Sequence, residues 1–119
     1  GLLRAGVDYA LDAGLLLVAS TGNTPHVDIG FPARWPDVIA VGATTSADQL
    51  WSGTTTGPEM DLVAPGDRIF TTVDQSSNLN GYTDATGTSM AAPMVAAVVP
   101  AAPLSGLSGC TDSCRSLRH

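Results

Sequence analysis

Apolar residues near the start of the chain recur at helical spacing. They lie three and four residues apart on one face, at Leu3, Val7, Ala10 and Leu11. This spacing predicts a helix over residues 3–13 with one buried face. Gly14 follows at the position where glycine often closes a helix in the left-handed conformation. A continuous apolar run at residues 15–19 is then typical of a strand buried on both faces of a parallel sheet.

The rest of the pattern predicts strands and loops before a second helix. Residues 38–43 form an apolar run that indicates another buried strand, and residues 69–73 alternate with threonine as a further strand. Shorter, irregular strands are expected around residues 49–52 and 62–63. The polar, glycine-containing stretch 74–86 predicts a surface loop, and an alanine-rich helix begins near Thr88. The order of elements is that of an α/β chain.

Composition and charge exclude several classes of protein. Hydrophobic residues make up 44% of the 119 residues and charged residues 13%, which is unlike a disordered chain. The net charge of −6 argues against a nucleic-acid binder, which normally has a basic face. No apolar run approaches the roughly 20 residues that a membrane helix needs. The first residues do not resemble a secretory leader, so we expect any signal peptide to lie outside this sequence.

A serine stands where a glycine-punctuated loop becomes a helix, in Gly87-Thr88-Ser89-Met90-Ala91-Ala92-Pro93. Gly87 permits close approach of another group, and Pro93 fits the first turn of a helix. The free N–H groups and positive dipole end of a helix stabilise negative charge, so Ser89 can attack a carbonyl whose oxyanion is stabilised there. Two alternatives are an N-cap role for Thr88 or Ser89 and phosphate binding at the helix end.

This seven-residue string resembles the nucleophile motif of the subtilisin-like serine proteases, the subtilase family. Three further segments resemble the family in its own order: residues 15–23, residues 31–43 and residues 57–66 with their Ala-Pro-Gly turn. Together they cover about residues 5–99. The resemblance implies the C-terminal half of a catalytic domain, with a three-layer α/β fold in which helices flank a mostly parallel sheet.

The resemblance also implies roles for individual residues. Ser89 is the expected nucleophile, the Asn23 side-chain amide completes the oxyanion hole, and Thr88 supports that hole. The pocket for the substrate residue before the cleaved bond is expected to have one wall and a base, formed by Ser20, Thr21 and Gly22 and by Ile29, Gly30 and Phe31. An ordinary turn at Gly22-Asn23 and ordinary packing of the base residues are the alternatives.

Partners and cofactors follow from the same resemblance. It implies a polypeptide substrate and a secreted protein, and it allows calcium in surface loops. No set of calcium or other metal ligands is recognisable in the sequence.

The acid and base of the family's triad are missing from this pattern. Both precede the serine in chain order, in Asp-Ser-Gly or Asp-Thr-Gly and in His-Gly-Thr-His. Neither histidine, His26 or His119, has that setting, and neither do the aspartates Asp8, Asp12 and Asp61. We therefore expect a fragment that is inactive alone and whose missing N-terminal half carries the acid and base. A non-catalytic binding or scaffold module on the same fold is the alternative.

The end of the chain departs from the family. Met94 and Ala97 replace a usual histidine and glycine, and Pro100 and Pro103 interrupt a helix that is longer in the family. We expect residues 1–99 to form the domain fragment and residues 100–119 to be an irregular tail outside the fold. The tail holds Cys110 and Cys114, which we expect to be unpaired.

Overall fold

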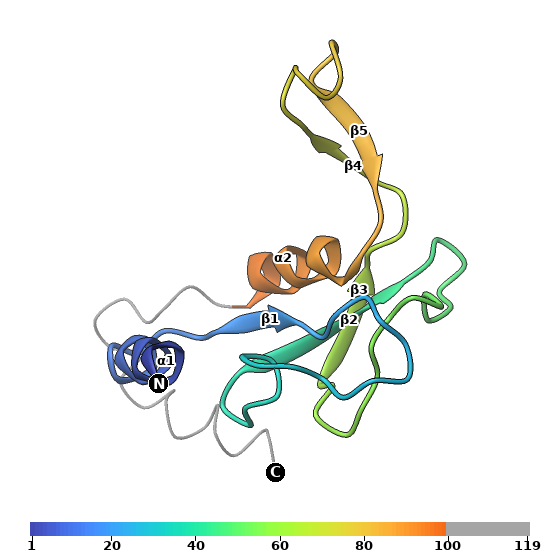
Figure 1. Cartoon of the computed structure of the whole chain (residues 1–119). Helices are drawn as coiled ribbons and strands as arrows, with labels where there is room; N and C mark the ends of the chain where they lie inside the picture. The colour runs from blue at the N-terminus through green and yellow to red at the C-terminus, as the bar shows by residue number, and fades with distance from the viewer. Residues whose placement is uncertain (100–119) are drawn as a thin grey trace.

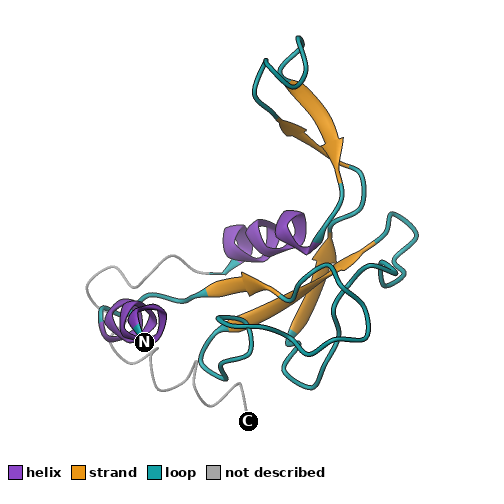
Figure 2. Cartoon of the chain, in the orientation of Figure 1, coloured by secondary structure: helices purple, strands orange, loops and turns teal. Residues whose placement is uncertain are grey.

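A parallel three-stranded sheet and the helix that covers it form the centre of the chain (Figures 1 and 2). The computed structural model describes residues 1–99. The elements follow in the order α1 (Leu2–Asp12), β1 (Val18–Ser20), β2 (Ile39–Thr44), β3 (Leu62–Pro65), β4 (Ile69–Thr72), β5 (Tyr82–Ala85) and α2 (Thr88–Val98). The predicted α/β class, with helices and a parallel sheet, is confirmed.

The three central strands run parallel in the order β1-β2-β3. Asp61 fixes the start of the β2–β3 pairing, since its carboxylate accepts the Ala40 N–H at 2.8 Å and its own N–H donates to the Ala40 carbonyl at 2.9 Å. Because parallel strands end at one edge of a sheet, the loops that follow β1 and β3 leave from the same side. In open α/β sheets this edge is where ligands bind.

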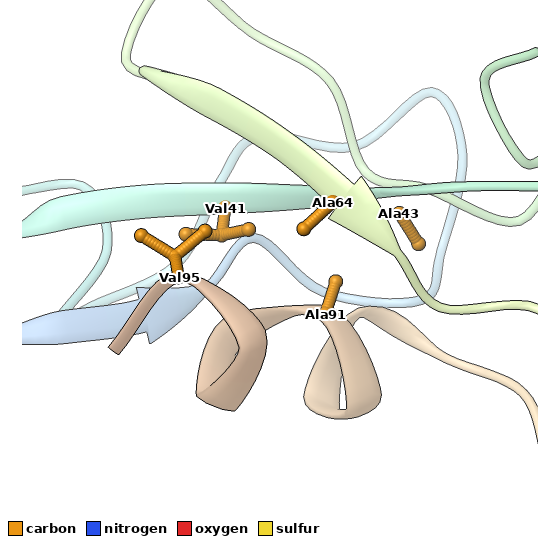
Figure 3. Close-up of a cluster of buried hydrophobic side chains, with 5 residues drawn as sticks. All are labelled: Val41, Ala43, Ala64, Ala91 and Val95. Atoms are coloured by element: carbon orange, nitrogen blue, oxygen red, sulfur yellow. The ribbon is translucent and has the colours of Figure 1, made fainter. Parts of the chain in front are cut away.

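Helix α2 lies against one face of this sheet and contacts all three strands. Figure 3 shows the contact, where α2 and the strands meet through small side chains: Val41, Ala43, Ala64, Ala91 and Val95. Alanine at these places lets the helix approach closely, as its composition predicts. A second buried cluster joins Ala40 to Ile29 and Ala33 of the loop after β1. The sheet therefore holds both the helix and this loop in position.

The predicted first helix is confirmed as α1, and Gly14 closes it with φ +84°. Its anchoring to the rest of the chain is partly polar. The Arg4 guanidinium donates to both Asp37 oxygens at 3.0 and 2.6 Å and lies 4.8 Å from the centre of the Trp35 ring. Hydrogen bonds to Asp37 and to Asp8 raise the pKa of Arg4 above its ordinary range.

The bounds predicted for the first strand, residues 15–19, are wrong. β1 covers only Val18–Ser20, and Leu15 and Leu16 are 45% and 36% exposed. The Leu15 N–H still donates to the Ala10 carbonyl at the end of α1, so this part of the apolar run completes the helix terminus. A short apolar run has the same composition in either setting, which is why the pattern did not separate them.

Two other strand assignments are also corrected. Residues 74–86 were predicted as a loop, but Tyr82–Ala85 pair as β5 with β4 in antiparallel register, because tyrosine and threonine favour strands once a partner is present. Residues 49–52 form only an isolated bridge between Leu50 and Thr44. The short strand expected at 62–63 is β3, slightly longer than predicted.

Pro93 lies inside α2 instead of in its first turn. The helix begins at Thr88, so Pro93 is its sixth residue. Since proline has no N–H, the Ser89 carbonyl lacks its usual helical donor.

The expectations about the tail fall outside the described residues. They concern Pro100, Pro103, Cys110, Cys114 and His119. Within residues 1–99, each helix has 11 residues and is too short to cross a membrane.

Candidate active site

Ser89 is the second residue of α2, and its side chain is exposed. Gly87 occupies the N-cap and supplies no side-chain cap, so the alternative of an N-cap role for Thr88 or Ser89 does not hold. The first N–H groups of a helix have no intrahelical acceptor. Within residues 1–99 the Ser89 N–H makes no hydrogen bond, so it remains available beside the Ser89 hydroxyl.

Asn23 meets the start of this helix from the loop that follows β1. Its Oδ1 accepts the Thr88 backbone N–H and the Thr88 hydroxyl, both at 2.8 Å. The Thr88 hydroxyl in turn accepts the Gly22 N–H at 3.2 Å. These bonds fix which way the amide faces, because its oxygen is occupied. Its Nδ2 makes no hydrogen bond within the described part of the chain, so the donor end of the amide is free.

Gly87 brings this amide and the serine hydroxyl to the same space. A Cβ placed on Gly87 would lie 3.0 Å from Asn23 Nδ2 and 3.4 Å from Ser89 Oγ. The Asn23 amide donor and the nucleophile candidate are thus neighbours across a position that only glycine leaves open. A larger residue there would displace one of them.

Gly66, which follows Ala64 and Pro65 at the end of β3, contacts the serine loop. Gly87 donates its N–H to the Gly66 carbonyl at 2.8 Å. A Cβ on Gly66 would lie 2.7 Å from the Gly87 carbonyl oxygen and 2.7 Å from Ala43 Cβ. Both contacts are too short for a real side chain, so glycine at residue 66 lets the turn, the sheet and the serine loop meet.

Replacing Gly66 with alanine is expected to lower the free energy of unfolding by about 1–3 kcal/mol, the usual cost of overpacking. Urea denaturation followed by circular dichroism measures this change. Gly6→Ala is the matched control, since that helical position is open and alanine should raise stability by about 0.5–1 kcal/mol. Equal stability of Gly66→Ala and the unmodified protein would contradict the close approach at residue 66.

Buried Thr55 holds the Asn23 loop from its other side, and its buried neighbour Thr54 ties the same segment to β2. The sequence did not mark either residue. The Thr55 hydroxyl accepts the Thr24 N–H at 3.0 Å and donates to the Thr24 carbonyl at 2.7 Å. Thr54 makes the equivalent pair of bonds with the Ala43 N–H and carbonyl. Gly22, with φ +116°, lies where a Cβ would be 2.9 Å from the Thr55 hydroxyl. Asn23 is therefore held between Thr55 and Thr88. Hydroxyl residues in a row are typical of an exposed loop, so only the fold reveals this role.

Comparison with known proteins assigns this arrangement to a family. Residues 2–102 match the model of the Subtilase family. This chain belongs to the subtilase family. It is 40% identical over 96 residues to the alkaline elastase YaB of Bacillus sp. (strain YaB), covering 81% of this chain and 24% of the elastase. It is 39% identical over 98 residues to subtilisin DY of Bacillus licheniformis, covering 79% of this chain and 34% of that protein.

Solved structures agree with the subtilase assignment. The PatG macrocyclase in complex with peptide superposes with a TM-score of 0.68 at 28% identity, covering 80% of this chain and 28% of that one. The prenylagaramide maturation protease PagA also superposes with a TM-score of 0.68 at 28% identity, covering 77% and 33%. The predicted subtilisin-like fold is thereby confirmed. This subtilase chain spans about a quarter to a third of the length of the two curated relatives.

The predicted pocket residues of the subtilase lie on two neighbouring segments. Ser20 ends β1, and Thr21 and Gly22 follow it. Ile29, Gly30 and Phe31 lie in the loop that packs on the sheet. Ile29 and Thr21 are buried, and Gly30 and Phe31 are exposed. Among the residues that the structure describes, the Thr21 hydroxyl has no hydrogen-bond partner. Their part in a substrate pocket stays a prediction.

Within residues 1–99 no acidic side chain or histidine forms a hydrogen bond to Ser89. His26 lies in the exposed loop after Asn23, with φ +64°, and forms no hydrogen bond to the serine. Asp8 pairs with Arg4 on α1 at 2.7 Å, and Asp61 bonds the backbone of β2. Within residues 1–99 no three histidine, cysteine or acidic side chains gather as metal ligands. Calcium binding stays a prediction.

Proposed function

We propose that this chain carries the nucleophile and oxyanion hole of a serine endopeptidase that hydrolyses peptide bonds in polypeptides. The hydroxyl oxygen of Ser89 bonds to the scissile carbonyl carbon, and its proton passes to a histidine base outside this chain. The carbonyl oxygen becomes an oxyanion that accepts hydrogen bonds from Asn23 Nδ2 and the Ser89 N–H. When the tetrahedral intermediate collapses, the C–N bond breaks and the histidine gives its proton to the leaving amine. Water then hydrolyses the acyl-enzyme and restores the Ser89 hydroxyl.

The free donor end of Asn23 is the single observation that carries this proposal. Two bonds from Thr88 hold the amide oxygen, and the Nδ2 lies on the side of Gly87 where the Ser89 hydroxyl also lies. A donor fixed before reaction stabilises developing charge without reorganisation. Thr88 supports the hole by positioning, because the proton of its hydroxyl already goes to Asn23 Oδ1.

The missing acid and base are part of the proposal. The chain spans about a quarter to a third of these relatives, which are named as an elastase and a subtilisin. We place the triad aspartate and histidine in sequence outside this chain, and with them the second wall of the pocket. Secretion and calcium in surface loops belong to the same proposal. The competing function is a binding or scaffold module that keeps the subtilase fold without turnover.

Hydrolysis assays at two chain lengths separate these functions. The protein at its native length is expected to cleave a tetrapeptide p-nitroanilide, whereas the 119-residue chain alone shows no turnover because a serine without its base loses most of its reactivity. A scaffold module would give no hydrolysis at either length. Turnover by the 119-residue chain that disappears in Ser89→Ala would contradict the placement of the base outside it.

A further inference from the structure

The β4–β5 hairpin presents an aromatic face to solvent. Alternate residues of each strand are exposed, and Phe70 and Tyr82 lie on the exposed face, 71% and 50% accessible. Their rings stack at a centroid distance of 5.3 Å and an angle of 9°. In the register, Phe70 lies opposite Asp84 and Tyr82 lies opposite Thr72. We call the stacked pair, Phe70 and Tyr82, the aromatic platform.

The hairpin is joined firmly to the serine loop at its base. β5 continues through Thr86 and Gly87 into α2. The Thr86 hydroxyl donates to Asp67 Oδ1 at 3.0 Å and accepts the Arg68 N–H at 2.9 Å. With the bond between Gly87 and Gly66, these contacts tie both strands to the loop that presents Ser89. Figure 1 shows the hairpin projecting from the sheet and α2 on this base.

The platform lies within reach of a bound polypeptide. Tyr82 precedes Ser89 by seven residues. An extended chain rises roughly 3.3 Å per residue, so the two are at most about 23 Å apart along the backbone. A polypeptide held at Ser89 could place a residue on the platform within about seven positions of its scissile bond.

We propose that the aromatic platform is a docking site for substrate polypeptide remote from the scissile bond. It takes an apolar or aromatic substrate side chain, and Asp84 beside Phe70 takes a neighbouring lysine or arginine. The proposal rests on the proposed function of Ser89. It deepens that function, because it makes long polypeptides better substrates than short peptides.

Charge and continuity favour this occupant. Asp84 is exposed and supplies a negative group directly beside the apolar surface, which suits a basic residue next to an apolar one. The platform is also continuous with the serine loop through β5. Aromatic side chains carry much of the energy of protein interfaces at small entropy cost.

The test compares two peptides of roughly 16 residues that share one cleavable core. One peptide carries a Phe-Lys pair about six residues from the scissile bond, and the other carries Ser-Ser at the same place. The Phe-Lys peptide is made in two versions, with the pair before or after the scissile bond. In the native-length protein the better-placed Phe-Lys version should give a kcat/KM about tenfold higher than Ser-Ser, the usual weight of an aromatic contact. Phe70→Ser with Tyr82→Ser should abolish that preference and leave hydrolysis of a tetrapeptide unchanged. Asp84→Asn should reduce the preference for lysine over norleucine beside the phenylalanine.

Tyr9→Ser is the matched control, since Tyr9 is an exposed aromatic on α1, away from the hairpin. The same peptides bound to the Ser89→Ala protein, followed by fluorescence anisotropy, repeat the comparison without turnover. A preference for Phe-Lys that survives loss of the platform, or falls equally in Tyr9→Ser, overturns the proposal. Absence of any preference in the unmodified protein overturns it too. Failure of tetrapeptide hydrolysis instead overturns the function of Ser89, and the anisotropy comparison still decides the platform.

Discussion

Replacing Ser89 with alanine is expected to lower kcat of the native-length protein by about 10⁶, the loss known for removing the triad serine of a subtilisin. In the proposed mechanism the hydroxyl oxygen of Ser89 forms the acyl bond, and alanine supplies no atom to replace it. The Asn23 and Thr88 contacts do not involve the Ser89 side chain, so folding and peptide binding should persist. Tetrapeptide hydrolysis and peptide anisotropy measure the two effects separately.

Ser46→Ala is the control for this loss, because Ser46 is an exposed serine in the turn after β2. It should keep full activity. Activity of Ser89→Ala close to that of the unmodified protein would mean that another residue is the nucleophile.

Replacing Asn23 with aspartate is expected to lower kcat by at least about 10²–10³, the range for losing one oxyanion-hole donor. Aspartate keeps an oxygen that accepts the Thr88 N–H and hydroxyl, so the loop stays attached to α2. It replaces the Nδ2 donor with a negative oxygen that repels the oxyanion. KM should change far less than kcat, because the lost contact forms in the transition state.

Asn80→Asp makes the same charge change on the exposed hairpin loop and should leave kcat unchanged. Urea denaturation should give closely similar midpoints for the two variants. An unchanged kcat in Asn23→Asp would remove the amide from the mechanism and leave it only a role in capping α2.

The spacing of apolar residues predicted those helices and strands whose buried positions follow a local pattern. The helix at α1 and the strands β2 and β4 have repeating apolar positions, and each is found close to its predicted bounds. β5 could not be predicted in the same way, because Tyr82–Ala85 become a strand through pairing with β4. Leu15 shows the converse, because the apolar run predicts a strand there although the Leu15 N–H bonds to the end of α1.

In the candidate site, too, the sequence predicted the residues that stand in local motifs and missed those that act through distant contacts. Ser89 and Asn23 stand in recognisable short motifs, and the structure brings them together at Gly87. The residues that hold them have no local signature. Thr55 bonds to Thr24, and Gly66 bonds to Gly87. Thr88 bonds to both Gly22 and Asn23. All of these hydrogen bonds join segments that are distant in the sequence. Such positioning depends on tertiary packing, which spacing along the chain does not encode.

The central claim is that Ser89 is an activated nucleophile once the rest of the domain is present. Treating the native-length protein with a fluorophosphonate, then mapping the adduct by mass spectrometry after proteolysis, tests it most directly. We predict one adduct, on Ser89, which is lost in Ser89→Ala and strongly slowed in Asn23→Asp. An adduct on a different serine, or none in a protein that hydrolyses peptides, would contradict the account.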